Sequence, residues 1–229
     1  PKSRSFLKKI VVSDDPDKTL SNKEFPWLSY RDIEIGMCPV RALRVAYTGE
    51  LGWELHHPIE MQNYLLDILL SSGKEFNLKL VGARAQNWLR QEKSYKAFGS
   101  DLGRDAGPFE SKLSRFVDIN KNFLGKDALL KRKTDVSCVT LLIDGPKDID
   151  PWGREALYNE TEEVMLGRLT SAGYSVHFKR SIGIGYVKSS FSEVGTKLRI
   201  KIDDAFWNAE IVRDSPYDPQ NERIIDRAQ

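Results

Sequence analysis

The pattern of hydrophobic residues changes near residue 135, and this change limits what the chain can fold into. Beyond that point, short apolar runs such as SCVTLLIDG, GIGYVK and FWNAEIV are separated by glycine-containing or charged turns. Runs of this length, rich in β-branched and aromatic residues, are typical of strands. Their close succession predicts an all-β domain, a small barrel or sandwich, over residues 136–229. The last stretch, SPYDPQNERIIDRAQ, is expected to be an extended tail.

Residues 1–135 mix helix and strand signals, which predicts an α+β fold for this part. Apolar residues at helical spacing in EMQNYLLDILLSS predict a helix over 60–72, with Gly73 placed to end it. A second helix is predicted over 82–94. Its core-facing residues are expected to be Ala85, Trp88 and Leu89. The stretch KAFGSDLGRDAGPFE is typical of a loop, and NKNFLGKDALLKRK of a turn followed by a short helix.

The composition is that of a globular protein and argues against several classes of partner. Hydrophobic residues make up 40% of the 229 residues and charged residues 30%. The formal net charge is +2 and no long basic block is present, so we expect no nucleic-acid partner. The longest apolar run, YLLDILL, is too short to span a membrane. Cys38 and Cys138 belong to no CxxC motif, so we expect free thiols in the reducing cytoplasm or mitochondrial matrix.

A β-hairpin is predicted around YTGELGWELHHP, residues 47–58. Strand-like alternation in RALRVAY and WELH flanks a turn in which Gly49 and Gly52 supply backbone freedom. After the turn, Trp53 and Leu55 share one face of the strand and Glu54 points to the other. Two interpretations of Glu54 stay open from these residues: a solvated surface acid, or one wall of a binding site.

The histidines and the glycine pair further along the chain carry weaker signals. His56 and His57 are adjacent on a strand and point to opposite faces, and only His177 lies elsewhere, so we expect no metal site. Gly183 and Gly185 lack the third glycine and the helix of a dinucleotide-binding motif. Close backbone packing in a barrel strand is the better interpretation of these glycines.

Arg84 stands at the start of the second predicted helix, within VGARAQNWLRQE. A cation there opposes the helix dipole, which favours negative charge at its N-terminus. Such a departure from local preference is expected either at a functional site or where the side chain caps a loop or pairs with Glu92.

Several motifs together resemble the folate-binding T-protein (aminomethyltransferase) family of the glycine cleavage system. They are YTGELGWEL, GARAQNWLRQEKSYKAFGSDL, GPFESKLSRFVDINKNFLGKDAL and SIGIGYV, in this order along nearly the whole chain. A finer resemblance is to the T-protein-like C-terminal half of dimethylglycine and sarcosine dehydrogenases. It rests on FPWLSYRDIEIGMCPVRALRVAYTGELGWELH, DPWGREAL and SPYDPQNERI.

The resemblance implies a fold around tetrahydrofolate that ends in a β-barrel, and it implies site residues. In the family, the second glutamate of the YTGExGxE motif, here Glu54, hydrogen-bonds the pterin. The arginine of the ARD motif, here Arg84, contacts the folate, and Tyr47 would supply an aromatic wall or a hydroxyl. A carboxylate suits the pterin because it can accept bonds from two adjacent N–H donors. Ala85 stands where the family has an aspartate, so any pairing made by that aspartate is lost.

The resemblance also implies an activity, namely capture of a carbon from an N-methyl amine as methylenetetrahydrofolate. FAD would belong to an upstream flavin domain or partner chain of a longer parent. The alternative is a non-catalytic regulatory or assembly module on the same fold.

The stretch PKSRS, starting at Pro1, resembles a segment inside the first domain of the family, so we expect an N-terminally truncated chain. The aspartate that acts near the folate amine would lie upstream. Asp101 is not its counterpart and is expected to shape a loop. The catalytic residues are therefore unknown, and we expect the chain alone to be inactive.

Overall fold

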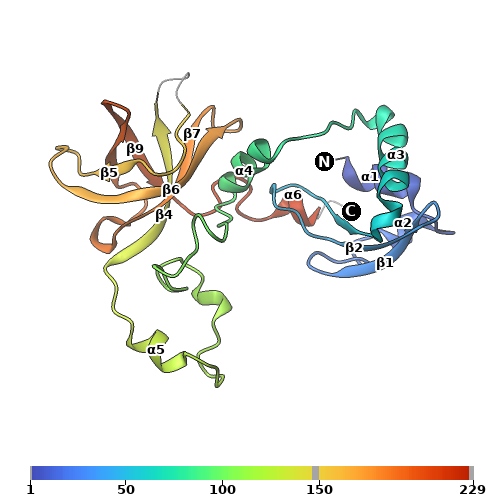
Figure 1. Ribbon diagram of the computed structural model, residues 1–229, viewed down its shortest axis with the longest axis horizontal. Coiled ribbons are helices and arrows are strands. Elements are labelled where there is room, and N and C mark those ends of the chain that lie inside the picture. The colour runs from blue at the N-terminus through green and yellow to red at the C-terminus, as the bar shows by residue number, and fades with distance from the viewer. Residues whose placement is uncertain (1, 146–149, 227–229) are drawn as a thin grey trace. The chain divides into compact units, whose positions relative to one another are not determined.

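The computed structural model describes residues 2–145 and 150–226, which form two compact units (Figure 1). Unit 1 comprises Pro1–Gln86 and Asp218–Gln229, and unit 2 comprises Asn87–Tyr217. The chain therefore leaves unit 1 for unit 2 and returns to unit 1 at its end. Pro1 and the last residues of the predicted tail, 227–229, lie outside the described residues.

Unit 1 is built from an antiparallel sheet with helices packed on one face. The strands lie in the order β1 (Tyr30–Ile35), β2 (Cys38–Leu43) and β3 (Glu54–His56). The helical elements are α1 (Ser3–Ile10), α2 (Pro16–Thr19), η1 (Ile59–Met61), α3 (Gln62–Gly73) and η2 (Lys74–Phe76). Apolar side chains of α1, β1, β2 and α3 form a single hydrophobic cluster, which fixes the sheet against these helices.

The predicted hairpin around Glu54 is confirmed, with a longer connection than the sequence suggested. Leu43 pairs with Glu54 in the register of β2 and β3, so residues 44–53 form the connecting loop. Gly49 adopts a positive φ of 78°, a conformation that glycine adopts without strain. Trp53 and Leu55 pack against the core while Glu54 is exposed, as the alternation predicts.

The third helix ends where the sequence predicts, but Gly73 acts differently from a left-handed helix cap. Its φ is −75°, and the left-handed residue is Asn77, which follows η2. A Cβ at position 73 would lie only 2.7 Å from the Cβ of Leu78. Gly73 is therefore required by the close approach of Leu78 rather than by its own backbone conformation.

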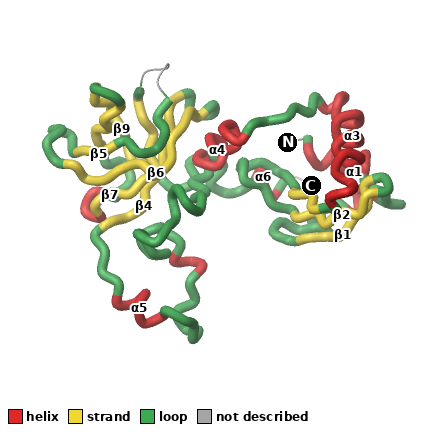
Figure 2. The backbone as a smooth tube through the Cα atoms, viewed as in Figure 1, coloured by secondary structure: helices red, strands yellow, loops and turns green. Residues whose placement is uncertain are grey.

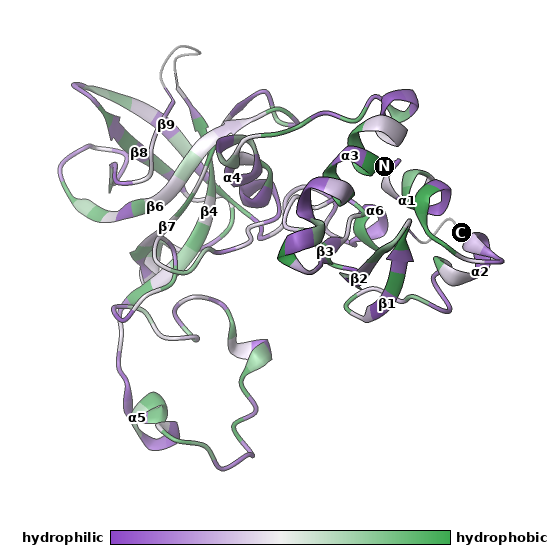
Figure 3. Cartoon of the chain, turned by 45° about the vertical axis from the view of Figure 1, so that its right-hand side comes forward, coloured by the Kyte–Doolittle hydropathy of each residue, from purple (hydrophilic) through white to green (hydrophobic). Residues whose placement is uncertain are grey.

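The helix predicted over 82–94 is α4 (Ala83–Glu92), and the prediction of its buried face was wrong in part. The expected core residues are only partly buried: Ala85, Trp88 and Leu89. The fully buried residues are polar and lie at its C-terminal end: Arg90, Gln91 and Glu92. Figure 3 shows the hydrophilic character of this helix. Burial is possible because polar partners are present; the Glu92 carboxylate, for example, accepts a 2.5 Å hydrogen bond from Ser175.

Unit 2 contains the β-barrel that the sequence predicts, drawn in yellow in Figure 2. The barrel closes in the order β4-β7-β6-β5-β8-β9. The strands are β4 (Val136–Asp144), β5 (Ala156–Tyr158), β6 (Met165–Ser175), β7 (Arg180–Lys188), β8 (Lys197–Ile202) and β9 (Ala205–Val212). A short 3-10 turn, η4 (Ser189–Phe191), follows β7. The short strand β5 was not predicted from the sequence.

The glycines of β7 allow neighbouring strands to approach closely, as predicted. A Cβ at position 185 would lie 2.5 Å from the carbonyl oxygen of Arg168 in β6. A Cβ at position 183 would lie 3.0 Å from a methyl group of Leu169. The inward side chains of the barrel strands form a continuous hydrophobic cluster that includes Leu169.

Two segments outside the barrel complete the description. Residues 112–135 include η3 (Ser114–Phe116) and α5 (Lys126–Lys131), and every one of them is exposed or half-buried. The domain boundary proposed near residue 135 falls between α5 and β4, inside unit 2, and stays a prediction. The tail was expected to be extended. Instead it forms the short helix α6 (Glu222–Ile225), in which Ile224 is buried.

None of the helices in the described ranges combines the length and apolar character that crossing a membrane requires.

We predict that Gly185→Ala destabilises the barrel by about 1–3 kcal/mol, because the added methyl group meets main-chain atoms of β6 that cannot move aside. Urea unfolding followed by tryptophan fluorescence measures the change. Gly103→Ala is the matched control, because no described atom lies within 4 Å of a Cβ at that position. Equal stabilities of the two variants would contradict the close approach of β6 and β7.

Candidate functional site

Glu54 lies on the outer face of the unit 1 sheet, on the edge strand β3. Its side chain is 56% exposed, and its Oε2 atom lies 3.3 Å from Nε2 of His56, two residues further along the same face. No partner among the described residues is recorded for its Oε1 atom. The carboxylate is therefore available to accept further hydrogen bonds.

The two other predicted site residues also belong to unit 1. Tyr47 is half-buried in the loop between β2 and β3. Arg84 is exposed in the first turn of α4, as the sequence predicts. The structure thus places Tyr47 and Glu54 at opposite ends of one loop region. The roles of all three residues in ligand binding stay predictions.

A cavity of about 940 Å³ lies beside Glu54 on the same sheet. Its lining includes Asp32, Arg41 and His56, but not Glu54 itself. Asp32 and Arg41 form an exposed ion pair through two hydrogen bonds of 2.8 and 3.1 Å, which lowers the pKa of Asp32. The guanidinium of Arg41 also lies 5.2 Å from the ring centre of Tyr30. The sheet therefore presents an aromatic and charged surface next to the predicted pterin contact.

The histidines do not form a metal centre in the part of the chain that the structure covers, since no cluster of metal-ligating residues is found there. Cys38 and Cys138 are free and buried. Burial raises the pKa of Cys138 to about 12, so this thiol stays protonated at neutral pH.

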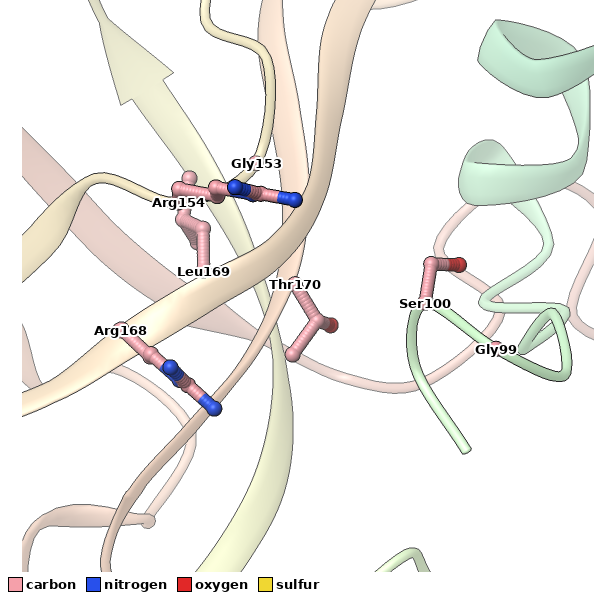
Figure 4. Close-up of a pocket in the computed structure, with 7 residues that line it drawn as sticks. All are labelled: Gly99, Ser100, Gly153, Arg154, Arg168, Leu169 and Thr170. Carbon is pink, nitrogen blue, oxygen red and sulfur yellow. The ribbon is translucent and has the colours of Figure 1, made fainter. Parts of the chain in front are cut away.

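A second cavity, of about 520 Å³, lies on the barrel in unit 2 and was not predicted from the sequence. Figure 4 shows the residues that line it. They are Gly99, Ser100, Gly153, Arg154, Arg168, Leu169 and Thr170. The lining thus carries two cationic side chains and two hydroxyl groups, and it includes no acidic residue.

The loop before β5 holds Arg154 at this cavity. Gly153 has a φ of 95°, and a Cβ there would lie 2.5 Å from the Cα of Ser171, so the loop lies directly against β6. The carboxylate of Glu155 accepts hydrogen bonds from the main-chain amides of residues 152, 153 and 154, at 2.7, 2.9 and 2.8 Å. These bonds fix the backbone that leads up to Arg154.

Strand pairing brings Arg168 to the same face as Arg154. Ala156 pairs with Arg168 across β5 and β6, and extending this register places Arg154 opposite Thr170. Figure 4 shows Arg154 and Arg168 beside the strand that carries Thr170. No ion pair or hydrogen bond with another described residue is recorded for either guanidinium group. Two such cations at one cavity favour an anionic ligand.

Thr170, which lines this cavity, is hydrogen-bonded to a buried ion pair between Arg90 and Asp101. Their side chains are 2% and 0% exposed, and Nη1 of Arg90 lies 2.7 Å from Oδ2 of Asp101. The same carboxylate accepts bonds from the amide of Ala97 at 2.9 Å and from the hydroxyls of Thr170 and Ser171 at 2.5 and 2.6 Å. Asp101 therefore shapes the 97–101 loop, as predicted, and also joins it to the barrel.

A β-bulge explains how two consecutive side chains reach one carboxylate. Leu169 pairs with Gly185 and Ser171 with Ile184, which leaves Thr170 as the extra residue in β6. Consecutive side chains of a regular strand point to opposite faces, and a bulge relaxes this alternation. Since Thr170 donates its proton to Asp101, its hydroxyl can only accept a hydrogen bond from a ligand.

Two family profiles match this chain, one over its N-terminal part and one over its C-terminal part. The profile described as the GCVT N-terminal domain matches residues 1–121. The profile described as the glycine cleavage T-protein C-terminal barrel domain matches residues 137–218.

Curated relatives include mitochondrial dimethylglycine dehydrogenase of Homo sapiens, 34% identical over 93% of this chain and 24% of that protein. An aminomethyltransferase of Caldanaerobacter subterraneus is 30% identical over 93% of this chain and 55% of that protein. This chain therefore spans about a quarter of the length of the dehydrogenase. The crystal structure of glycine cleavage system aminomethyltransferase T from Bartonella henselae superposes with a TM-score of 0.77. The superposition covers 93% of this chain and 56% of the aminomethyltransferase chain, at 21% sequence identity. This likeness shows a shared fold.

We predict that Asp101→Asn lowers the free energy of unfolding by about 3–5 kcal/mol, because the Arg90 guanidinium then stays buried without its countercharge. Asp32→Asn is the matched control. It breaks an exposed pair with Arg41 and is expected to change stability by about 0–1 kcal/mol. Chemical unfolding of both variants measures the difference. A small effect at Asp101 would mean that this buried pair does not hold the loop to β6.

Proposed function

The chain belongs to the glycine cleavage T-protein family, and on this premise we propose that it is the tetrahydrofolate-binding portion of a one-carbon transfer enzyme. The proposed type is aminomethyltransferase or dimethylglycine (sarcosine) dehydrogenase, in which an N-methyl amine supplies the carbon captured as methylenetetrahydrofolate. The observation that carries the proposal is the exposed carboxylate of Glu54, presented after the YTGELGW turn with its Oε1 available.

Glu54 is proposed to bind the pterin end of tetrahydrofolate. The pterin offers an exocyclic amine and a ring N–H side by side, and an ionised carboxylate accepts such a pair of donors. The contact with His56 uses Oε2, so Oε1 and the second lone pair of Oε2 are available for the pterin. Tyr47 would supply a ring or a hydroxyl, and Arg84 a cationic contact.

Arg154 and Arg168, which both belong to unit 2, are proposed to bind a carboxylate-bearing ligand there. The cavity on the barrel presents two guanidinium groups without an acidic residue in its lining. Hydrogen bonds between a guanidinium and a carboxylate are charge-assisted, and they are stronger than those between neutral groups.

Bound tetrahydrofolate supplies the amine nitrogens that accept the one-carbon unit. The residues of this chain would hold that ligand in one orientation and limit the access of water to a reactive intermediate. Oxidation of the N-methyl amine is proposed to take place in a flavin domain or partner chain of a longer protein, and FAD would belong there. The free, buried cysteines fit the reducing compartment proposed for such an enzyme.

The pterin contact is tested with a pterin fragment, because each site belongs to one unit and can be probed separately. We predict that Glu54→Gln weakens binding of 6-hydroxymethylpterin by about 1–3 kcal/mol, since the amide offers one acceptor and one donor where the ligand needs two acceptors. Ligand-observed NMR with the 229-residue chain measures the affinity. Glu193→Gln, an exposed acid on the barrel, is the control. Unchanged pterin affinity in the Glu54 variant would contradict the assignment of Glu54 as the pterin contact.

The anion contact is tested with p-aminobenzoylglutamate. We predict that Arg154→Met and Arg168→Met each weaken its binding severalfold, and that added salt weakens binding to the wild-type chain. Arg180→Met is the control, because it removes the same charge from the barrel while its guanidinium is already paired with Asp144 at 2.9 Å. Equal losses in all three variants would indicate a general effect of net charge and would contradict a specific site.

A further inference from the structure

Arg4 and Arg44 form an unusual concentration of buried positive charge in unit 1. Their side chains rank among the largest fully buried ones, with 2% and 1% of the residue exposed. Burial and the charge of Arg4 lower the pKa of Arg44 to about 10. Arg4 comes from α1, and Arg44 follows β2 directly, at the start of the 44–53 loop. Two buried cations are costly unless partners are supplied from elsewhere in the chain.

The end of the chain supplies those partners. Oδ2 of Asp226 lies 3.2 Å from Nη1 of Arg4, and the carbonyl of Ile225 accepts a 2.6 Å hydrogen bond from Nη2 of Arg44. Asn22 bridges the two sides. Its Oδ1 accepts from Arg4 at 2.7 Å, and its Nδ2 donates to the carbonyl of Asp226 at 2.7 Å. A carboxylate and a carbonyl that follow the barrel in sequence therefore complete the interior of unit 1.

The same C-terminal segment also contacts the loop that carries the proposed pterin site. Nη1 of Arg223 lies 3.5 Å from Oε1 of Glu50, in the middle of that loop. From the other side, Ser3 donates a 2.6 Å hydrogen bond to the carbonyl of Leu51. The loop is thus held at its start by Arg44 and in its middle by Arg223 and Ser3.

We propose that the C-terminal segment, residues 218–226, is a positioning element for the 44–53 loop and so for pterin binding at Tyr47 and Glu54. The inference rests on the proposed function for its ligand, while the ordering of the loop follows from the contacts alone. Asp226 is its main positioning residue, because this half-buried carboxylate pairs with the buried Arg4, and the carbonyl of Ile225 binds the buried Arg44 at the start of the loop. Arg223 adds a contact at the surface. Binding at the start of the hairpin thereby depends on residues that lie beyond the barrel in sequence.

The experiment measures hydrogen exchange of the backbone amides of residues 44–53 in the 229-residue chain, with and without 6-hydroxymethylpterin. Asp226→Asn keeps the shape of the side chain but removes the charge that faces Arg4. We expect exchange in the loop to become about tenfold faster, exchange in β4 of the barrel to stay unchanged, and pterin affinity to fall. Asp226→Glu keeps the charge and is expected to restore part of the protection.

A second variant covers the case in which Asp226→Asn unfolds unit 1. Arg223→Gln changes a side chain that is 55% exposed, so the fold is expected to persist, and loop exchange should rise by a smaller factor. Arg180→Gln is the matched control, since it breaks a surface ion pair of the barrel and should leave the loop unchanged.

Unchanged loop exchange in both Asp226→Asn and Arg223→Gln would overturn the proposal. Faster exchange with unchanged pterin affinity would overturn the positioning role. Absence of pterin binding by the wild-type chain would count against the proposed function alone, because the exchange measurement needs no ligand.

Discussion

The buried ion pair of Asp101 with Arg90 is the interaction that holds α4 and the loop after it to the barrel of unit 2. The Asp101 carboxylate is removed from water, and a buried charge is tolerated only when its lone pairs are satisfied and its charge is matched. Arg90 matches the charge, and the amide of Ala97 and the hydroxyls of Thr170 and Ser171 use the remaining lone pairs. One side chain thus joins the end of α4, the loop after it and strand β6 of the barrel. A shift of any of these elements would remove a hydrogen bond from a buried charge.

Unit 1 meets a similar requirement with the opposite sign. Arg4 and Arg44 are buried there, and their partners come from Asn22 and from residues 225 and 226. In both units, the buried charges connect segments that lie far apart in the sequence. Such contacts contribute less net stability than apolar packing of the same volume, but removal of one partner is strongly destabilising. They therefore specify which segments must come together more than they stabilise the fold as a whole.

The elements that could be predicted from the sequence are those whose signal is local. Short apolar runs bounded by turn residues identify strands such as β4 and β7, and the family motifs identify the hairpin that carries Glu54. Burial of a charged residue has no local signal, because sequence reasoning assigns arginine and aspartate to the surface. The buried end of α4 was therefore missed. The tail was expected to be extended, because its own residues give no sign that Asp226 pairs with an arginine near the start of the chain.

The cavity on the barrel was missed for a related reason, although a weak local signal exists. In GRLTS, Arg168 and Thr170 are two residues apart and so share a face of the strand, and DPWGRE places Arg154 directly after a glycine with positive φ. Neither pattern shows that β5 pairs with β6 in the register that brings the arginines together. That register depends on long-range pairing, and the bulge at Thr170 adds a displacement that alternation alone does not predict.

The two proposed sites, one in each unit, rest on different kinds of support. The arginine cavity is backed by the Asp101 network, since Thr170 belongs to both, and its loop is fixed by the Glu155 carboxylate against three amides. Glu54 stands on a short edge strand after a loop whose order comes from contacts made by the chain termini. Residues in separate units without shared partners contribute nearly additively. Changes at one proposed site should therefore leave the intrinsic affinity of the other unchanged, and the pterin affinity proposed for Glu54 should depend on the order of the 44–53 loop.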